Sequence, residues 1–160
     1  MKHSSQARYP ASSDVVIKMF CDPEFHKRKM DKLGIRYEIL EEDHNGDEFR
    51  LKVERHVPVK ASGIVKKIMP ATTQVVNDEC WNQSDKSGTV VVETKGVPLD
   101  MRCSAQMRDE GDECVIDYNW EIKARIPIGG GALEKFVVGD MGKSEAEERD
   151  VGVELLDDYR

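Results

Sequence analysis

The chain has 160 residues, a formal net charge of −7, 39% hydrophobic residues and 34% charged residues. This length and composition are typical of a globular protein with its own core, and we expect a single domain over residues 1–160. The acidic charge argues against a nucleic-acid or anionic-membrane surface, because such surfaces need clustered lysine and arginine. We recognise no secretory signal and no apolar stretch of membrane-spanning length, so we expect a cytoplasmic protein that is not an integral membrane protein.

The cysteines and histidines do not suggest a metal site. The cysteines have no CxxC spacing and no histidines at metal-ligand spacing, so we expect reduced thiols, no metal ion and no cofactor. The one basic run, His26–Lys29, falls in an expected helix, and we interpret it as a solvated face. We expect all four histidines to be exposed rather than catalytic: His3, His26, His44 and His56.

The first third of the chain predicts a short strand followed by two short helices. Residues 3–9 form the strand. Ser12 or Ser13 then provides an N-cap for the first helix. Asp22 caps the second, with Pro23 at its first position, and Gly34 ends it. The two helices therefore meet near residue 22.

From Ile35 the apolar residues alternate, which predicts strands. Residues 35–39 and 49–57 flank a turn at 43–47, and further strands are expected at 63–69, 72–82 and 90–94. Arg55 is the exception in its strand, because it falls among the inward-facing apolar residues. In the strand at 72–82, either facing turns a carboxylate inward, that of Asp78 or that of Glu79.

The last hairpin gives the clearest register. Residues 97–107 and 114–126 alternate apolar and polar residues, and a turn at 109–112 lets both apolar sets share one face. The predicted cross-strand pairs are Met107 with Cys114, Cys103 with Tyr118, and Met101 with Trp120. One apolar face and one polar face indicate an antiparallel sheet that is covered on a single side.

The C-terminal stretch predicts one long helix up to Tyr159. Its apolar residues recur at helical spacing near both ends, but the same face carries Asp140, Ser144 and Glu147 or Glu148 in the middle. We interpret this as a helix whose two ends pack and whose centre faces a cavity. The element order predicts an α+β domain in which a curved antiparallel sheet of about seven strands wraps around the long C-terminal helix.

Three segments resemble the START-like helix-grip fold, known as the SRPBCC superfamily. Asp22–His26 resembles the short-helix entry that many members share, and Val97-Pro98 lies where a bent strand is expected. Ile126–Phe136, which contains Gly129-Gly130-Gly131, resembles the strand-to-helix joint of one uncharacterised bacterial branch. The resemblance covers nearly the whole chain, and it implies a fold that binds hydrophobic ligands.

Candidate ligand-binding residues are those expected to face the cavity from the sheet and the helix. Thioether and aromatic side chains make an adaptable apolar wall, and a few polar groups orient a bound molecule. Arg55 has two interpretations: it holds a ligand carboxylate or phosphate, or it forms a structural ion pair with Glu79, Asp78 or a helix acid. Asp140 and Glu147 have three open interpretations: each meets a ligand hydroxyl, caps a buried arginine or reaches solvent. The candidate set is Arg55, Glu79, Met101, Cys103, Tyr118, Trp120, Val137, Met141 and Ser144.

Three functions fit these residues, and we predict the first. The protein is a carrier or sensor that binds a hydrophobic or lipid-like small molecule in the cavity. Alternatively it is a cyclase or hydratase, which the superfamily allows, using Tyr118, Arg55 and an inward acid. The third alternative is an interaction module with a filled core and a protein partner, like the START-like chaperone cofactors. We expect no catalytic residue, because no nucleophile elbow and no cysteine with a neighbouring histidine is present.

Overall fold

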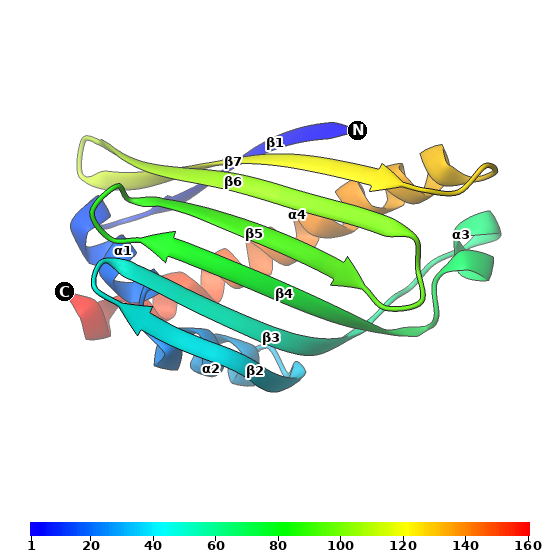
Figure 1. Cartoon of the computed structure of the whole chain (residues 1–160). Coiled ribbons are helices and arrows are strands. Elements are labelled where there is room, and N and C mark those ends of the chain that lie inside the picture. The colour runs from blue at the N-terminus through cyan, green and yellow to red at the C-terminus, as the bar shows by residue number, and fades with distance from the viewer.

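The computed structural model describes all residues, 1–160, and contains one sheet, four α-helices and a short 3-10 helix (Figure 1). The strands are β1 (Lys2–Tyr9), β2 (Arg36–Asn45), β3 (Glu48–Pro58), β4 (Thr72–Asn82), β5 (Ser87–Thr94), β6 (Leu99–Glu110) and β7 (Glu113–Ala124). The helices are α1 (Ser13–Phe20), α2 (Pro23–Lys32), α3 (Gly63–Ile68), α4 (Gly130–Leu155) and the 3-10 helix η1 (Leu156–Tyr159).

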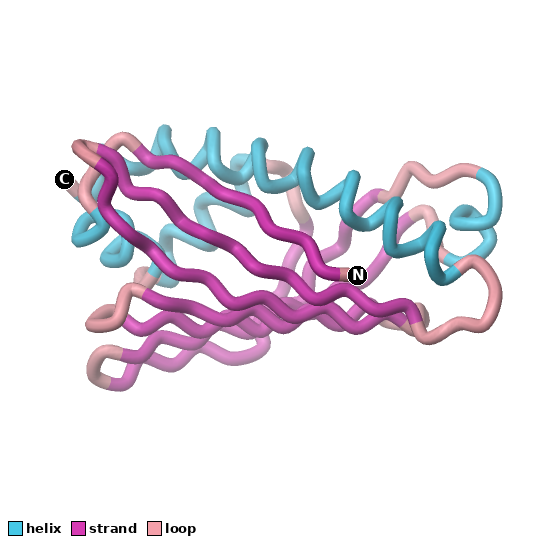
Figure 2. Tube along the Cα trace, turned by 90° about the horizontal axis from the view of Figure 1, so that it is seen from above, coloured by secondary structure: helices cyan, strands magenta, loops and turns pink.

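The seven strands form one antiparallel sheet in the order β1-β7-β6-β5-β4-β3-β2. Consecutive strands are neighbours except at β1, which pairs with β7 at the far edge. The sheet curves, and α4 runs along its inner face (Figure 2). This is the α+β helix-grip architecture that the sequence predicts. No helix is both long enough and apolar enough to cross a membrane.

The two short helices begin where the sequence places their caps. The Ser12 side chain accepts a hydrogen bond from the Val15 amide, and the Asp22 carboxylate accepts one from the Glu24 amide at 3.0 Å. These bonds satisfy amides that the first helical turn leaves free. Gly34, at φ +68°, adopts the left-handed conformation just after α2. The chain therefore turns from helix into strand β2 within a few residues.

The predicted register of the last hairpin is wrong by two residues. Met107 pairs with Ile116, Cys103 with Trp120, and Met101 with Ile122. The reason is the turn, which contains only Gly111 and Asp112, with Gly111 at φ +62°. Because side chains alternate with period two, a shift of two residues leaves every side chain on its predicted face.

The predicted strand at 63–69 is also wrong, because the segment forms helix α3. Val65 and Ile68 pack in the same core cluster and lie three residues apart, a spacing that places them on one side of a helix but on opposite faces of a strand. Val65 is buried, and the Ile64 side chain lies against the backbone of Gly129, just before α4. α3 therefore packs at the end of the sheet where α4 begins (Figure 1).

The core consists of two separate clusters. The larger one gathers α1, α2 and the end of α4 around Phe20, Trp81 and Ile116. The smaller one joins α3 and the beginning of α4 around Leu99 and Leu133. The buried residues of α4 are accordingly confined to its two ends: Leu133, Val137, Gly152 and Leu155. The middle of α4 has no fully buried residue, as its broken apolar stripe predicts.

Candidate functional site

A cavity of about 250 Å³ lies between the inner face of the sheet and the middle of α4. Its lining is mainly apolar, since 20 of the 32 lining residues are hydrophobic. Residues of both core clusters contribute, among them Phe20 and Trp81 from one and Leu99 and Met101 from the other. The cavity therefore separates two packed ends of the domain.

Eight of the nine candidate residues line this cavity: Arg55, Glu79, Met101, Tyr118, Trp120, Val137, Met141 and Ser144. Cys103 does not, although it is buried on the inner side of β6. Burial raises the pKa of the Cys103 thiol to about 12, and its Sγ donates a hydrogen bond to the Ser104 carbonyl. Cys103 is thus a protonated thiol within the sheet. A binding role for the other eight stays a prediction.

Arg55 points inward and faces an acid of the terminal helix. Its Nη1 lies 3.7 Å from Oε1 of Glu148, and Lys29 Nζ lies 3.4 Å from the same oxygen. Burial raises the pKa of Glu148, but the charges of Lys29 and Arg55 outweigh this effect and hold the pKa below its usual value. The structure therefore contains the ion pair with a helix acid that was one interpretation of Arg55.

The facing of β4 is resolved in favour of Glu79. Its carboxylate lines the cavity and accepts a hydrogen bond of 2.6 Å from the indole Nε1 of Trp81. Asp78 lies on the other face of the sheet and binds the Arg50 guanidinium through two hydrogen bonds of 2.8 and 2.9 Å. The Arg50 hydrogen bonds lower the pKa of Asp78 despite partial burial. Asp78 is consequently a structural residue of the outer face.

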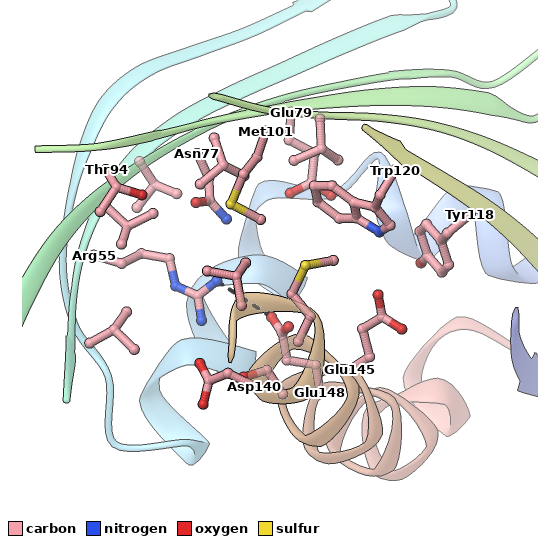
Figure 3. A pocket seen from close by; sticks show the side chains of 18 of the residues that line it. Arg55, Asn77, Glu79, Thr94, Met101, Tyr118, Trp120, Asp140, Glu145 and Glu148 are labelled. Carbon is pink, nitrogen blue, oxygen red and sulfur yellow. Dashed lines mark ion pairs between the residues drawn. The ribbon is translucent and has the colours of Figure 1, made fainter. Parts of the chain in front are cut away.

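Three buried polar atoms at the cavity have no hydrogen-bond partner in the protein: Arg55 Nε, Trp120 Nε1 and Glu145 Oε1. Figure 3 shows Arg55 on one side of the cavity and Trp120 and Glu145 on the other. Buried polar groups are normally paired, because leaving one unpaired costs about 1–3 kcal/mol. The cavity thus offers specific polar contacts as well as an apolar wall.

The sequence did not identify Glu145 or His26. Glu145 and Asp140 both line the cavity, although Asp140 is an exposed residue, whereas Glu147 is exposed and does not line it. The prediction that His26 is exposed is wrong. It is 2% exposed, and its Nε2 lies 2.7 Å from the Phe20 carbonyl oxygen. Helical spacing could have identified both residues. Glu145 lies four residues after Met141 and His26 lies four residues before Met30, so each shares a helix face with an inward-facing methionine.

No three metal-ligating side chains come together anywhere in the structure. All four cysteines are free thiols, and Cys80 is the only one that is not fully buried. Burial raises the pKa of Cys21 and of Cys114 to about 11. None of these thiols is positioned as a nucleophile next to the cavity.

Residues 4–156 match the sequence profile of a family described as "Protein of unknown function (DUF2505)". The chain belongs to this family. No functionally curated protein matches the sequence. The DUF2505 description gives no activity, so the fold provides the only further comparison.

Solved structures show that this DUF2505 protein has the START-like fold. A START superfamily protein from Mycobacterium smegmatis has a TM-score of 0.60 at 12% identity, covering 99% of both chains. Zhui aromatase/cyclase from Streptomyces sp. R1128 has a TM-score of 0.66 at 9% identity, covering 98% of this chain and 93% of its own. Norcoclaurine synthase from Thalictrum flavum, in complex with dopamine and hydroxybenzaldehyde, has a TM-score of 0.65 at 15% identity, covering 100% and 88%. At these identities the similarity establishes the fold alone.

Proposed function

We propose that this protein binds a hydrophobic small molecule in the cavity between the sheet and α4, as a carrier or sensor. The observation that carries the proposal is the cavity itself, about 250 Å³ in the middle of a domain that is packed at both ends. Protein cores are normally close-packed, and unfilled volume costs roughly 24 cal/mol per Å³. A chain with no ligand to bind would gain stability from larger side chains here.

The lining supports the same function. Met101, Met141 and Trp120 give an adaptable apolar surface. The lining also contains a few polar groups without a hydrogen-bond partner in the protein. An apolar wall with a few polar groups is typical of small-molecule sites. A protein-interaction module would have a filled core, whereas this domain has a cavity in its interior.

An enzymatic function of the cyclase or hydratase kind is the weaker alternative. Such an enzyme needs an acid whose pKa is raised toward neutrality. The acid beside Arg55 is Glu148, and its pKa is lowered by Lys29 and Arg55. Glu148 is therefore an ionised partner of two cations, which suits a structural role better than proton donation.

A cavity-filling variant tests the proposal. We expect the neutral dye N-phenyl-1-naphthylamine to bind the wild-type protein saturably, with a rise in fluorescence as it leaves water. Ser144 lines the cavity, so Ser144→Phe places a phenyl group in the space and abolishes this binding. Lys143→Phe adds the same group on the exposed side of the same helix and leaves binding unchanged.

Two outcomes would overturn the proposal. One is the absence of saturable dye binding to the wild-type protein. The other is equal binding to the wild type and to a folded Ser144→Phe variant, which would place the dye elsewhere. Thermal unfolding of both phenylalanine variants establishes that each is folded before the titration.

A further inference from the structure

Three polar groups meet at one end of the cavity: the Trp120 indole N–H, the Tyr118 hydroxyl and the Glu145 carboxylate. Trp120 and Tyr118 are inward residues of β7, and Glu145 comes from the middle of α4 opposite them. Figure 3 shows the three side chains pointing toward one shared space between sheet and helix. We call them the Trp120 cluster.

The Trp120 cluster lacks the hydrogen bonds that its burial calls for. Trp120 Nε1 and Glu145 Oε1 are both shielded from solvent, and neither has a partner within the protein. The indole N–H can only donate a hydrogen bond, and a carboxylate oxygen can only accept one. Burial, with smaller contributions from Tyr9 and Glu79, raises the pKa of Tyr118 well above its ordinary value, so its hydroxyl stays neutral. That hydroxyl can donate or accept.

The cations of the cavity do not serve this cluster. Arg55 and Lys29 both form their ion pair with Glu148, one helical turn beyond Glu145. The third basic residue of the lining, Arg149, donates hydrogen bonds to the Arg8 carbonyl oxygen and to the Asp150 carboxylate. A second carboxylate placed against Glu145 would therefore meet like charge without a cation to offset it. This disfavours an anionic ligand group at this end of the cavity.

The donors and acceptors define what fits. An ammonium group only donates, so it leaves the Trp120 N–H unpaired. A hydrocarbon satisfies neither Trp120 nor Glu145 and displaces solvent without replacing its hydrogen bonds. A hydroxyl group accepts from Trp120 and donates to Glu145 at the same time. We infer that the ligand is a neutral, largely apolar molecule that carries a hydroxyl group, and that the Trp120 cluster binds this group.

This inference rests on the proposed function, and a matched series of naphthalenes separates the two. The probes are 2-naphthol, 2-methylnaphthalene, 2-naphthoate and 2-naphthylmethylammonium, which differ only in the group that would meet the cluster. We expect calorimetric titration to give an affinity for 2-naphthol about tenfold higher than for 2-methylnaphthalene. The two charged probes should bind more weakly than 2-naphthol.

Substitutions then assign the preference to named residues. Glu145→Met removes the acceptor and replaces it with an unbranched apolar side chain of similar length. Trp120→Phe removes the donor and keeps an aromatic ring on the cavity wall. Both variants should bind 2-naphthol and 2-methylnaphthalene with affinities that differ less than threefold. Glu147→Met makes the same change at an exposed position of α4 and should keep the tenfold preference.

The outcomes distinguish the two claims. If 2-methylnaphthalene binds as well as 2-naphthol, the cavity binds hydrophobic molecules but the hydroxyl assignment is wrong. If a charged probe binds most tightly, the assignment is also wrong. If both Glu145→Met and Trp120→Phe keep the full preference, the hydroxyl group is bound by other residues. If no probe binds to the wild-type protein, the proposed function and this inference fail together.

Discussion

Arg55 of β3 and Lys29 of α2 converge on one carboxylate oxygen, Oε1 of Glu148, at 3.7 and 3.4 Å. All three side chains are mostly buried, with exposed fractions of 15%, 13% and 26%. The Lys29 ammonium also lies 5.3 Å from the centre of the Phe25 ring. A single acid of α4 thus links the terminal helix to the sheet and to α2, beside the cavity.

Replacing Glu148 should destabilise the protein. Glu148→Gln leaves two mostly buried cations without their anionic partner, and we expect a loss of about 2–3 kcal/mol in the free energy of unfolding. Urea denaturation measures this loss. Glu147→Gln, at the exposed neighbouring position, should change stability by less than about 0.5 kcal/mol. Equal effects of the two substitutions would show that the ion pair contributes nothing.

His26 should make stability depend on pH below neutrality. Burial lowers the pKa of His26 from 6.5, with Lys29 acting in the same direction and Glu79 opposing it. The folded state then binds a proton more weakly than the unfolded chain, so stability is complete above pH 6.5 and falls as the pH drops below it. The slope can reach about 1.4 kcal/mol per pH unit for one proton.

Urea denaturation between pH 7 and pH 5 tests this dependence. The slope should flatten in His26→Gln, which has no titrating group there, whatever its absolute stability. His44→Gln changes an exposed histidine and should keep the wild-type slope. An unchanged slope in His26→Gln would show that His26 does not cause the pH dependence.

Glycine-to-alanine substitutions should change the stability of the protein in opposite directions in β5 and in α4. A Cβ at Gly88 would lie 2.4 Å from Cε3 of the buried Trp81 ring, so Gly88→Ala should cost about 2 kcal/mol through overpacking. A Cβ at Gly139 meets nothing within 4 Å, and alanine favours a helix interior by about 1 kcal/mol. Gly139→Ala should therefore raise the thermal midpoint, and a fall there would contradict this account of α4.

Two cavity substitutions should weaken ligand binding. Arg55→Ala and Trp120→Ala each remove a cavity residue that has free hydrogen-bonding capacity, and we expect the affinity for a bound probe to fall at least tenfold. His44→Ala changes a residue of β2 that does not line the cavity and should leave the affinity unaltered. Unchanged binding in the first two variants would remove this cavity as the site.

The sequence predicted the features that follow from periodicity. Alternation in β6 and β7 placed Met101, Tyr118 and Trp120 on the inner face, and the broken stripe of α4 predicted a helix packed only at its ends. Alternation shows that a side chain faces inward, but it cannot reveal whether the volume it faces is empty or filled by other side chains. Cys103 faces inward beside Trp120 and yet does not line the cavity, because the facing of a side chain does not report empty volume.

The remaining features depend on contacts between distant parts of the chain. Which helix acid meets Arg55 is decided by how α4 lies across the sheet, and several acids of α4 were candidates. His26 is buried because its ring stacks on Phe49 of β3, with ring centres 5.7 Å apart. A basic run in a helix predicts a solvated face, but the prediction fails where a strand packs against that face, as β3 does at His26.

The methionine methyl groups provide the most direct test of the cavity. Four of the seven methionines line it, Met30, Met69, Met101 and Met141, whereas Met19 and Met107 are buried in the core and Met1 is exposed. We would titrate protein carrying ¹³C-labelled methionine methyls with 2-naphthol and record the methyl spectrum by NMR. The account predicts shifts at Met101 and Met141, with smaller ones at Met30 or Met69 and none at Met1 or Met107. Shifts confined to Met1, Met19 or Met107, or no shifts at saturating probe, would contradict binding between the sheet and α4.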